Sequence, residues 1–267
     1  MDVRSVFGCH TTPFTREIAP SEHFALPLFE QARDALRRAI DLRMSAALIA
    51  PAGTGKTALL RWLIADLPEA RYQVRVVKVC DLGKRDLCRE IARAVGLPPV
   101  GSYPALVQKL QERFEHEACN DGLRPVLLFD DAHGLRLDVL AILRVLTNFN
   151  MDSRLVLSVV LSGQLALRKT LEANDQLSVT RRLACTVTLR PLSREETCAY
   201  LEHRLHIAGV AASPFDQGAV ETLYELSRGN LRAIDGLALE AMQLAASAKL
   251  QAVGSNHVLA ARKNLWP

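Results

Sequence analysis

Five apolar runs rich in β-branched residues recur along the first 190 positions, and segments of helical period separate them. The runs cover residues 46–50, 74–79, 125–129, 155–161 and 185–189. Near-continuous apolar strands that alternate with helices are typical of a parallel sheet that is covered on both faces. We therefore predict an α/β fold in which a five-stranded parallel sheet is flanked by helices.

The strand signals stop near position 190, and only helical patterns follow. Residues 193–196 have the spacing of a capping box, which favours the start of a helix, and further helices are expected after Pro214 and Asn230. The pattern predicts two domains. An α/β core occupies residues 1–190, and a small all-helical lid occupies residues 191–267.

The first apolar run ends in a glycine-bearing turn that leads into a helix, the arrangement of a phosphate-binding loop. Gly53 and Gly55 leave room for backbone N–H groups to approach phosphate oxygens, and the start of the helix favours negative charge there. Lys56 is expected to reach the β- and γ-phosphates of ATP, and Thr57 to offer its hydroxyl to Mg²⁺. Ala50 stands where the full motif has its first glycine. The residues expected to hold ATP are Pro51, Ala52, Gly53, Thr54, Gly55, Lys56, Thr57 and Ala58.

Two carboxylates follow the third apolar run, at the end of a parallel strand where ligands bind in open α/β sheets. We expect Asp130 to hold the Mg²⁺ shell and Asp131 to orient or deprotonate the attacking water. The alternative is an ordinary helix-capping turn. His133 lies beside these aspartates, and we interpret it as a polar residue at a strand-to-helix corner rather than as a metal ligand.

Five further polar residues are candidates for sensing the γ-phosphate or for stabilising its transfer. Ser162 and Gln164 follow the fourth run and are expected beside the γ-phosphate, although either is also common in turns. Arg181 and Arg182 precede the fifth run, where one of them can project into the nucleotide of a neighbouring subunit; a surface pair is the alternative. Arg232 begins the third helix of the predicted lid and is expected to report the loss of the γ-phosphate.

The formal charge of +4 is concentrated in one segment. Residues 71–113 contain nine basic and four acidic residues, a net charge of +5. Within it, three apolar residues recur every four positions, and three arginines recur with the same spacing but an offset of two positions, or about 200° around a helix. The segment predicts a helix with one buried side and a row of arginines on the other. That row is either a solvated face or a contact to a phosphate backbone.

Nothing in the sequence indicates a membrane or a metal cluster. The apolar runs are too short to span a bilayer, and the first 17 residues contain no signal peptide. Six cysteines are scattered without a C-x-x-C pair. We expect a cytoplasmic protein with reduced thiols and no membrane partner.

Taken together, these motifs resemble the AAA+ ATPases, and more narrowly the ExeA/TniB/TnsC group. The similarity runs nearly from end to end. The phosphate-binding loop and the paired aspartates are common to many nucleotide hydrolases, whereas Gly163-Gln164 and the stretch over residues 190–197 are more specific to this group. Most relatives carry glutamate at the position of Asp131. Because aspartate is one methylene shorter, we expect slow turnover.

The resemblance implies one of two functions. ExeA-type secretion ATPases continue into a transmembrane helix and a wall-binding domain, neither of which is present in this sequence. The stand-alone members TniB and TnsC oligomerise with ATP on duplex DNA and recruit a transposase. We therefore expect an ATP-dependent DNA-binding regulator of transposition, with hydrolysis driving disassembly. Its partners would be duplex DNA, further copies of itself, a transposase and a target-selection adaptor. A helicase-loader-like ATPase and a cytoplasmic secretion or signalling ATPase are the alternatives.

The same resemblance implies positions for DNA and for the base of the nucleotide. Similarity to TnsC proteins places Arg85, and more weakly Ser102, at DNA-contacting positions. The full set of expected DNA contacts is Lys84, Arg85, Arg89, Arg93 and Ser102. Pro13 and Phe14 resemble the N-terminal segment that faces the adenine in this group.

Overall fold

The computed structural model describes residues 2–78, 82–173 and 180–265 and divides into two compact units. The first, which we call the sheet unit, comprises Pro27–Ala52 and Lys56–Leu189. The second, the helical unit, comprises Met1–Leu26, Gly53–Gly55 and Arg190–Pro267. The chain thus passes from one unit to the other at Leu189 and Arg190, and the short glycine segment of the phosphate-binding loop groups with the helices.

The sheet unit contains one five-stranded sheet in the order β2-β3-β4-β1-β5, and every neighbouring pair is parallel. This confirms the predicted fold class. The strands are β1 (Ser45–Ile49), β2 (Tyr72–Lys78), β3 (Arg124–Asp130), β4 (Ser158–Gly163) and β5 (Leu183–Thr188). The central strands β1, β3 and β4 are almost wholly buried because helices cover both of their faces, and β2 and β5 form the edges.

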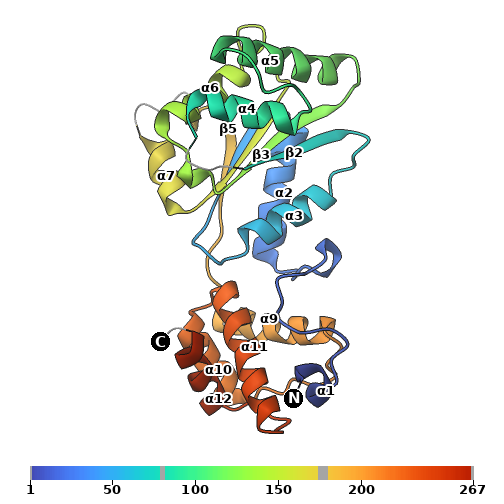
Figure 1. Cartoon of the computed structure of the whole chain (residues 1–267), viewed down its shortest axis with the longest axis vertical. Coiled ribbons are helices and arrows are strands. Elements are labelled where there is room, and N and C mark those ends of the chain that lie inside the picture. Colours follow the sequence, from blue (N-terminus) through green and yellow to red (C-terminus); the bar gives the residue numbers. More distant parts are fainter. Residues whose placement is uncertain (1, 79–81, 174–179, 266–267) are drawn as a thin grey trace. The chain divides into compact units, whose positions relative to one another are not determined.

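Helices lie on both faces of this sheet (Figure 1). They are α2 (Pro27–Asp41), α3 (Lys56–Ala65), α4 (Lys84–Ala94), α5 (Tyr103–Cys119), α6 (Leu137–Leu146) and α7 (Leu165–Glu172), with the 3₁₀ turn η2 (Ala132–Gly134) after β3. Side chains alternate across β3. Leu127 and Phe129 pack into one continuous core with α4, α5 and α6, whose fully buried members include Phe114. This core fixes the carboxyl end of β3, where the two aspartates lie.

The helical unit contains α1 (Val3–Phe7), η1 (Pro20–Glu22), α9 (Arg194–Ile207), α10 (Gln217–Ser227), α11 (Leu231–Ser247) and α12 (Ser255–Leu265). The capping box that starts α9 is formed as the sequence predicts, since the Ser193 hydroxyl accepts from the Glu196 N–H and the Glu196 carboxylate accepts from the Ser193 N–H. Asn230 caps α11 in the same way through the Ala233 N–H. No described helix in either unit is both long and apolar enough to cross a bilayer.

One predicted strand boundary was wrong. The fourth strand begins at Ser158 rather than at residue 155, because three consecutive left-handed residues at 150–152 form an irregular turn and leave Leu155 about half exposed. The helix after β2 begins at Lys84, after the N-cap Gly83, and therefore carries Lys84 as well as the row of arginines. Part of the predicted second strand, residue 79, lies outside the described residues.

Candidate active site

Lys56 is the first residue of α3, and its ammonium is held against the loop that precedes it. Its Nζ donates hydrogen bonds to the carbonyl oxygens of Ala50 (3.1 Å) and Pro51 (3.0 Å), and its side chain is buried. A buried cation needs such partners because desolvation is costly. Ala50 is buried at the end of β1 and has no left-handed backbone conformation, so the missing first glycine of the motif is tolerated there.

The two glycines that the motif retains are both in the left-handed region, with φ of +77° at Gly53 and +91° at Gly55. Within the helical unit, a Cβ on Gly53 would lie 2.3 Å from Oδ1 of Asn230, and the Gly53 carbonyl accepts from the Arg232 N–H at 3.1 Å. Glycine is therefore required at position 53 for conformation and for space. Arg232 meets the loop through its backbone N–H, and its side chain is exposed.

Three hydrogen-bond donors surround the Asp130 carboxylate at the carboxyl end of β3. The Thr57 hydroxyl donates to Oδ2 at 2.8 Å, and both the Ser162 hydroxyl and the Asp131 N–H donate to Oδ1 at 3.0 Å. The strand order makes this possible, because β3, β4 and β1 are neighbours and their carboxyl ends meet at one edge. A carboxylate beside a hydroxyl is a set of oxygen ligands that suits Mg²⁺. Thr57 and Asp130 are therefore the residues that would hold this ion.

Asp131 follows in a left-handed conformation, with φ of +55°, and its side chain is 69% exposed. This turn directs the second carboxylate away from the first, since Asp130 faces Thr57 and Ser162. An exposed carboxylate next to the Mg²⁺ ligands is suited to accept a proton from water. Gln164, the other expected sensor, lies at the start of α7, and its amide nitrogen is 3.0 Å from Nε2 of His133. Ser162 thus contacts the carboxylate that would hold Mg²⁺, whereas Gln164 contacts His133, which lies next to Asp131.

Arg182 lies at the opposite end of the sheet. It precedes Leu183, which pairs with Ser45 at the amino end of β1, whereas the phosphate-binding loop leaves the carboxyl end of β1. At about 3.3 Å per residue, the two ends of this strand are roughly 15 Å apart. Arg181 is exposed beside it. Neither arginine is brought to the phosphate-binding loop of its own chain, which is the placement expected of a residue that acts on a neighbouring subunit.

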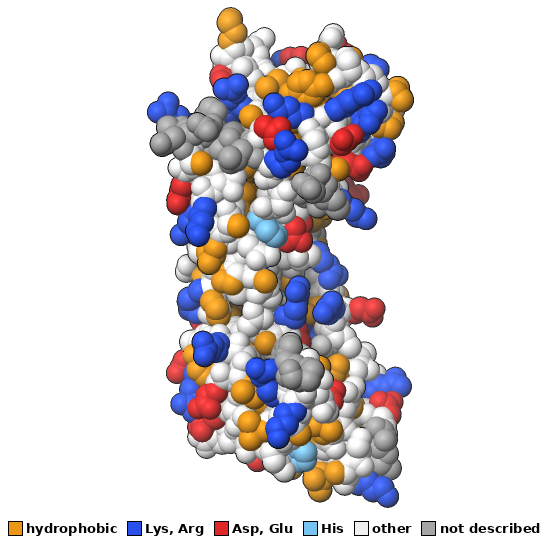
Figure 2. All heavy atoms as spheres, turned by 60° about the vertical axis from the view of Figure 1, so that its left-hand side comes forward, with side chains coloured by type: hydrophobic (Ala, Val, Ile, Leu, Met, Phe, Trp, Pro, Cys, Tyr) orange, Lys and Arg blue, Asp and Glu red, His pale blue; other side chains and the backbone are white. Residues whose placement is uncertain are grey.

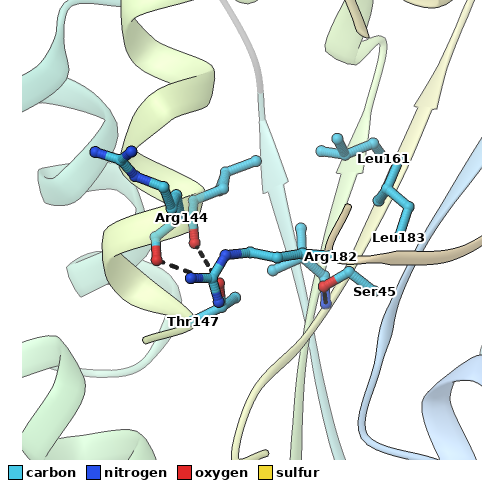
Figure 3. Close-up of a pocket in the computed structure, with 8 residues that line it drawn as sticks. Ser45, Arg144, Thr147, Leu161, Arg182 and Leu183 are labelled. Carbon is cyan, nitrogen blue, oxygen red and sulfur yellow. Dashed lines mark hydrogen bonds between the residues drawn. The ribbon is translucent and has the colours of Figure 1, made fainter. Parts of the chain in front are cut away.

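The Arg182 side chain crosses to the end of α6, where Figure 3 shows it beside Thr147 and Arg144. Its guanidinium also makes a bidentate ion pair with Asp152, with Nη1 2.6 Å from Oδ1 and Nη2 bonded to Oδ2. The hydrogen bond from Arg182 lowers the pKa of the Asp152 carboxyl. The C-terminal end of a helix and a carboxylate both favour a cation. Arg182 therefore has a defined resting position within its own chain. No pattern in the sequence indicates Asp152 as its partner.

The row of arginines occupies the surface of α4 as expected. Leu87 and Ile91 are fully buried on its inner side, while Arg85 and Arg93 are exposed on the outer side. Figure 2 shows basic side chains interspersed with acidic ones on this part of the surface. The two kinds of charge lie side by side because arginines of α4 are paired with carboxylates of the same helix. Within the row, Arg89 Nη1 lies 3.1 Å from Asp86, and Arg93 is paired with Glu90.

Arg85 is instead bonded to the loop that leads into α5. Its Nε donates to the Gly101 carbonyl at 3.1 Å, one residue before Ser102. Ser102 is the N-cap of α5, and its hydroxyl accepts from the Ala105 N–H. Two of the expected DNA contacts therefore meet at the starts of two adjacent helices, where partial positive charge concentrates. Lys84, the first residue of α4, is exposed at the same place.

Pro13 and Phe14 lie in the helical unit. Pro13 helps to line a hollow of about 280 Å³ together with Thr15 and Arg204. Phe14 is 3% exposed, and its ring packs edge-on against Phe215 at 6.2 Å and under the Arg204 guanidinium at 5.7 Å. Phe14 thus forms part of the core of this unit and does not line the hollow, so an adenine contact through its ring stays a prediction.

The sequence matches the AAA domain family over residues 39–171. It is 34% identical over 185 residues to the general secretion pathway protein A of Aeromonas hydrophila, a similarity that covers 68% of this chain and 34% of that protein. This chain thus spans about a third of the length of that relative.

Solved structures of similar fold cover most of the chain. The ORC1 protein of Aeropyrum pernix in complex with DNA superposes with a TM-score of 0.67 at 22% identity, over 94% of this chain and 68% of that one. Cdc6p of Pyrobaculum aerophilum gives 0.70 at 19%, over 99% and 71%. A RuvB variant of Thermotoga maritima gives 0.61 at 17%, over 89% and 68%. At these identities the structures establish the shared fold. The match to the AAA domain family supports the ATPase class that the motifs predict. Residues 39–171 therefore form an AAA domain, and the chain has the α/β P-loop fold of the AAA+ ATPases.

Proposed function

We propose that this protein is an ATP-dependent, DNA-binding regulator of DNA transposition. In this proposal, copies of the chain assemble on duplex DNA with ATP bound, mark a target site and recruit a transposase, and hydrolysis of ATP drives disassembly. The helices of residues 191–267 act as the lid of the nucleotide site. The cofactor is Mg²⁺, and the partners are DNA, further copies of the chain, a transposase and a target-selection adaptor.

The separation of Arg182 from the phosphate-binding loop carries the self-assembly part of this proposal. Mg²⁺, when held by Thr57 and Asp130, would neutralise charge on the phosphates. Asp131 takes a proton from water as the water oxygen bonds to the γ-phosphorus, and the bond to the bridging oxygen breaks so that ADP leaves with the electron pair. Charge on the leaving phosphates still needs an arginine. Because Arg182 lies at the far end of the sheet, a second copy has to supply it.

The starts of α4 and α5 support the DNA-binding part. Four basic and two acidic residues lie in α4, and its first two residues are basic and exposed beside the N-terminus of α5. Phosphate oxygens are favoured at such helix N-termini, where backbone N–H groups and basic side chains converge. The ORC1 protein, whose fold this chain shares, was solved in complex with DNA. Backbone contacts of this kind carry little sequence preference.

Replacing Arg85, Arg89 and Arg93 together with alanine is expected to weaken duplex binding and its dependence on salt. Each phosphate contact that is lost should reduce the slope of log affinity against log salt by about one, because fewer counterions are released. Fluorescence anisotropy of a labelled duplex, measured with a slowly hydrolysed ATP analogue at several salt concentrations, gives this slope. Arg85→Ala alone should have the largest single effect, because Arg85 lies at the junction of the two helices.

The matched control replaces Arg4, Arg136 and Arg194, which are exposed and paired with nearby carboxylates as Arg89 and Arg93 are. This control should retain the wild-type slope. An unchanged affinity and slope in the α4 variant would show that the row is a solvated face, and DNA would then have to bind elsewhere.

Lys56→Ala is expected to abolish measurable ATP binding. The substitution removes the ammonium that donates hydrogen bonds to the carbonyl oxygens of Ala50 and Pro51, and charge-assisted contacts to phosphate are among the strongest in proteins. Titration calorimetry with ATP and Mg²⁺ tests this directly. Because Lys56 is buried, the thermal midpoint of the variant should be recorded as well. Wild-type affinity in a folded variant would overturn the assignment of the loop.

A second candidate function is a secretion ATPase. The similarity to the general secretion pathway protein A favours it, and the fold is compatible with it. A measurement of duplex DNA binding with and without ATP distinguishes the two functions, since a secretion ATPase is not expected to bind duplex DNA in an ATP-dependent manner. A helicase-loader-like ATPase would bind DNA but would not stimulate a transposase. Adding a transposase to the DNA-bound protein therefore separates all three.

A further inference from the structure

His133 is the unexplained polar residue of the site. It lies in η2, two residues after Asp131, and its ring is only 25% exposed. Its Nδ1 atom is buried and makes no hydrogen bond to any described part of the chain. That nitrogen lies 3.8 Å from Oδ1 of Asp131, which is slightly beyond hydrogen-bond distance. A buried ring nitrogen facing a carboxylate at this distance needs a proton, because two lone pairs would otherwise repel each other.

The other ring nitrogen leads to the same protonation state. His133 Nε2 lies 3.0 Å from the amide nitrogen of Gln164, which can only donate a hydrogen bond. Nε2 must therefore accept, and in a neutral imidazole the proton then lies on Nδ1. Both sides of the ring thus specify the same tautomer, with Nδ1–H facing Asp131. Gln164 thus holds one side of the ring by a hydrogen bond, and the other side faces Asp131 across a gap of 3.8 Å.

Close packing surrounds the backbone of His133. A Cβ added at Gly163, at the end of β4, would lie 3.1 Å from the backbone nitrogen of His133 and 2.8 Å from the side chain of Leu167. The end of β4, the turn η2 and the start of α7 are therefore in direct contact. Gln164 follows Gly163 in the chain, so the residue that holds Nε2 is attached to the same rigid junction.

We propose that His133 is a positioning residue for Asp131, with Gln164 holding its ring. The inference rests on the proposed hydrolysis of ATP. Asp131 is largely exposed and one methylene shorter than the glutamate usual in such enzymes, so nothing on its own short side chain fixes the direction of its carboxylate. A small rotation of either side chain closes the 3.8 Å gap, and the Nδ1–H then orients the carboxylate toward the attacking water. A misplacement of about 1 Å at a reacting group costs on the order of 100-fold in rate.

Three substitutions at position 133 separate the two ring nitrogens. Asparagine places an N–H group near the position of Nδ1, and glutamine places one near Nε2, while alanine removes both. If Nδ1–H positions Asp131, His133→Asn should keep the turnover number within about threefold of wild type. His133→Gln and His133→Ala should lower it by about 10- to 100-fold. The Michaelis constant and the affinity for ATP should not change in any of the three, because the hydrogen bond of the His133 ring is to Gln164 and not to the phosphate-binding loop.

A double substitution shows whether His133 acts through Asp131. In an Asp131→Asn background, His133→Ala should cause little further loss, because residues that act as a unit are strongly non-additive. The full-length protein with duplex DNA is used throughout, and the ATP affinity and thermal midpoint of each variant confirm that it is folded. A loss that adds fully to that of Asp131→Asn would overturn the inference, as would equal losses in the asparagine and glutamine variants. Absence of any hydrolysis by the wild-type protein would instead refute the proposed function itself.

Discussion

Arg182→Ala is expected to lower the ATP turnover number of the assembled protein by about 10³- to 10⁵-fold, the range that arginine fingers contribute elsewhere. The reason is that Arg182, at the amino end of β5, is the side chain assigned to the nucleotide of a second copy. Its guanidinium is held in a defined orientation by Asp152 until then. The affinity of one subunit for ATP should change little. Steady-state hydrolysis is measured at protein concentrations where assembly is confirmed by light scattering.

Two matched variants identify the cause of that loss. Asp152→Asn removes the same ion pair but keeps Arg182, and asparagine tolerates the left-handed backbone at this position, where φ is +64°. It should retain turnover, since Arg182 must leave Asp152 before it reaches a phosphate. Arg181→Ala should also retain turnover. A loss in Asp152→Asn as large as that in Arg182→Ala would mean that the ion pair matters only for structure, and a selective loss in Arg181→Ala would move the role to that residue.

Asp131→Asn is expected to slow hydrolysis by about 10²- to 10⁴-fold while ATP binding stays intact. The amide is isosteric with the carboxylate but accepts no proton from water, and asparagine is compatible with the φ of +55° at this position. Because turnover is blocked after binding, assemblies held by ATP should also dissociate more slowly. Single-turnover hydrolysis and nucleotide titration separate the two effects.

The control is Asp138→Asn, which removes an exposed carboxylate in the first turn of α6. That variant should hydrolyse ATP at the wild-type rate. If Asp131→Asn does so too, the proton acceptor is another group, and the positioning role of His133 loses its basis.

The backbone arrangement of the site could be predicted from the sequence because it follows from rules of topology. Parallel strands bring their carboxyl ends to one edge, so Asp130 at the end of one strand and Ser162 near the end of another had to lie near the phosphate-binding loop. Periodicity likewise placed Leu87 and Ile91 inside and the arginines outside. These features depend on spacing along the chain, which a single sequence contains.

The side-chain partners could not be predicted, because they depend on where residues far apart in the chain come to lie. Asp152 meets Arg182 across 30 positions, and Gln164 meets His133 across 31. The sequence interpretation regarded His133 as an ordinary corner residue because nothing local indicates its contact. The burial of Phe14 under Arg204 has the same origin. Tertiary packing decided each of these positions, and local pattern had no bearing on them.

Hydrolysis shared between two copies of the chain is tested most directly by mixing two inactive variants. Lys56→Ala keeps Arg182 but cannot bind ATP, and Arg182→Ala binds ATP but cannot complete a neighbouring site. When the two proteins are combined with duplex DNA and ATP, and co-assembly is verified by a distinct label on each, interfaces that pair one of each kind should hydrolyse ATP. Activity should be greatest at intermediate mixing ratios. No recovery at any ratio, despite confirmed co-assembly, would contradict the assignment of Arg182 to the nucleotide of a second copy.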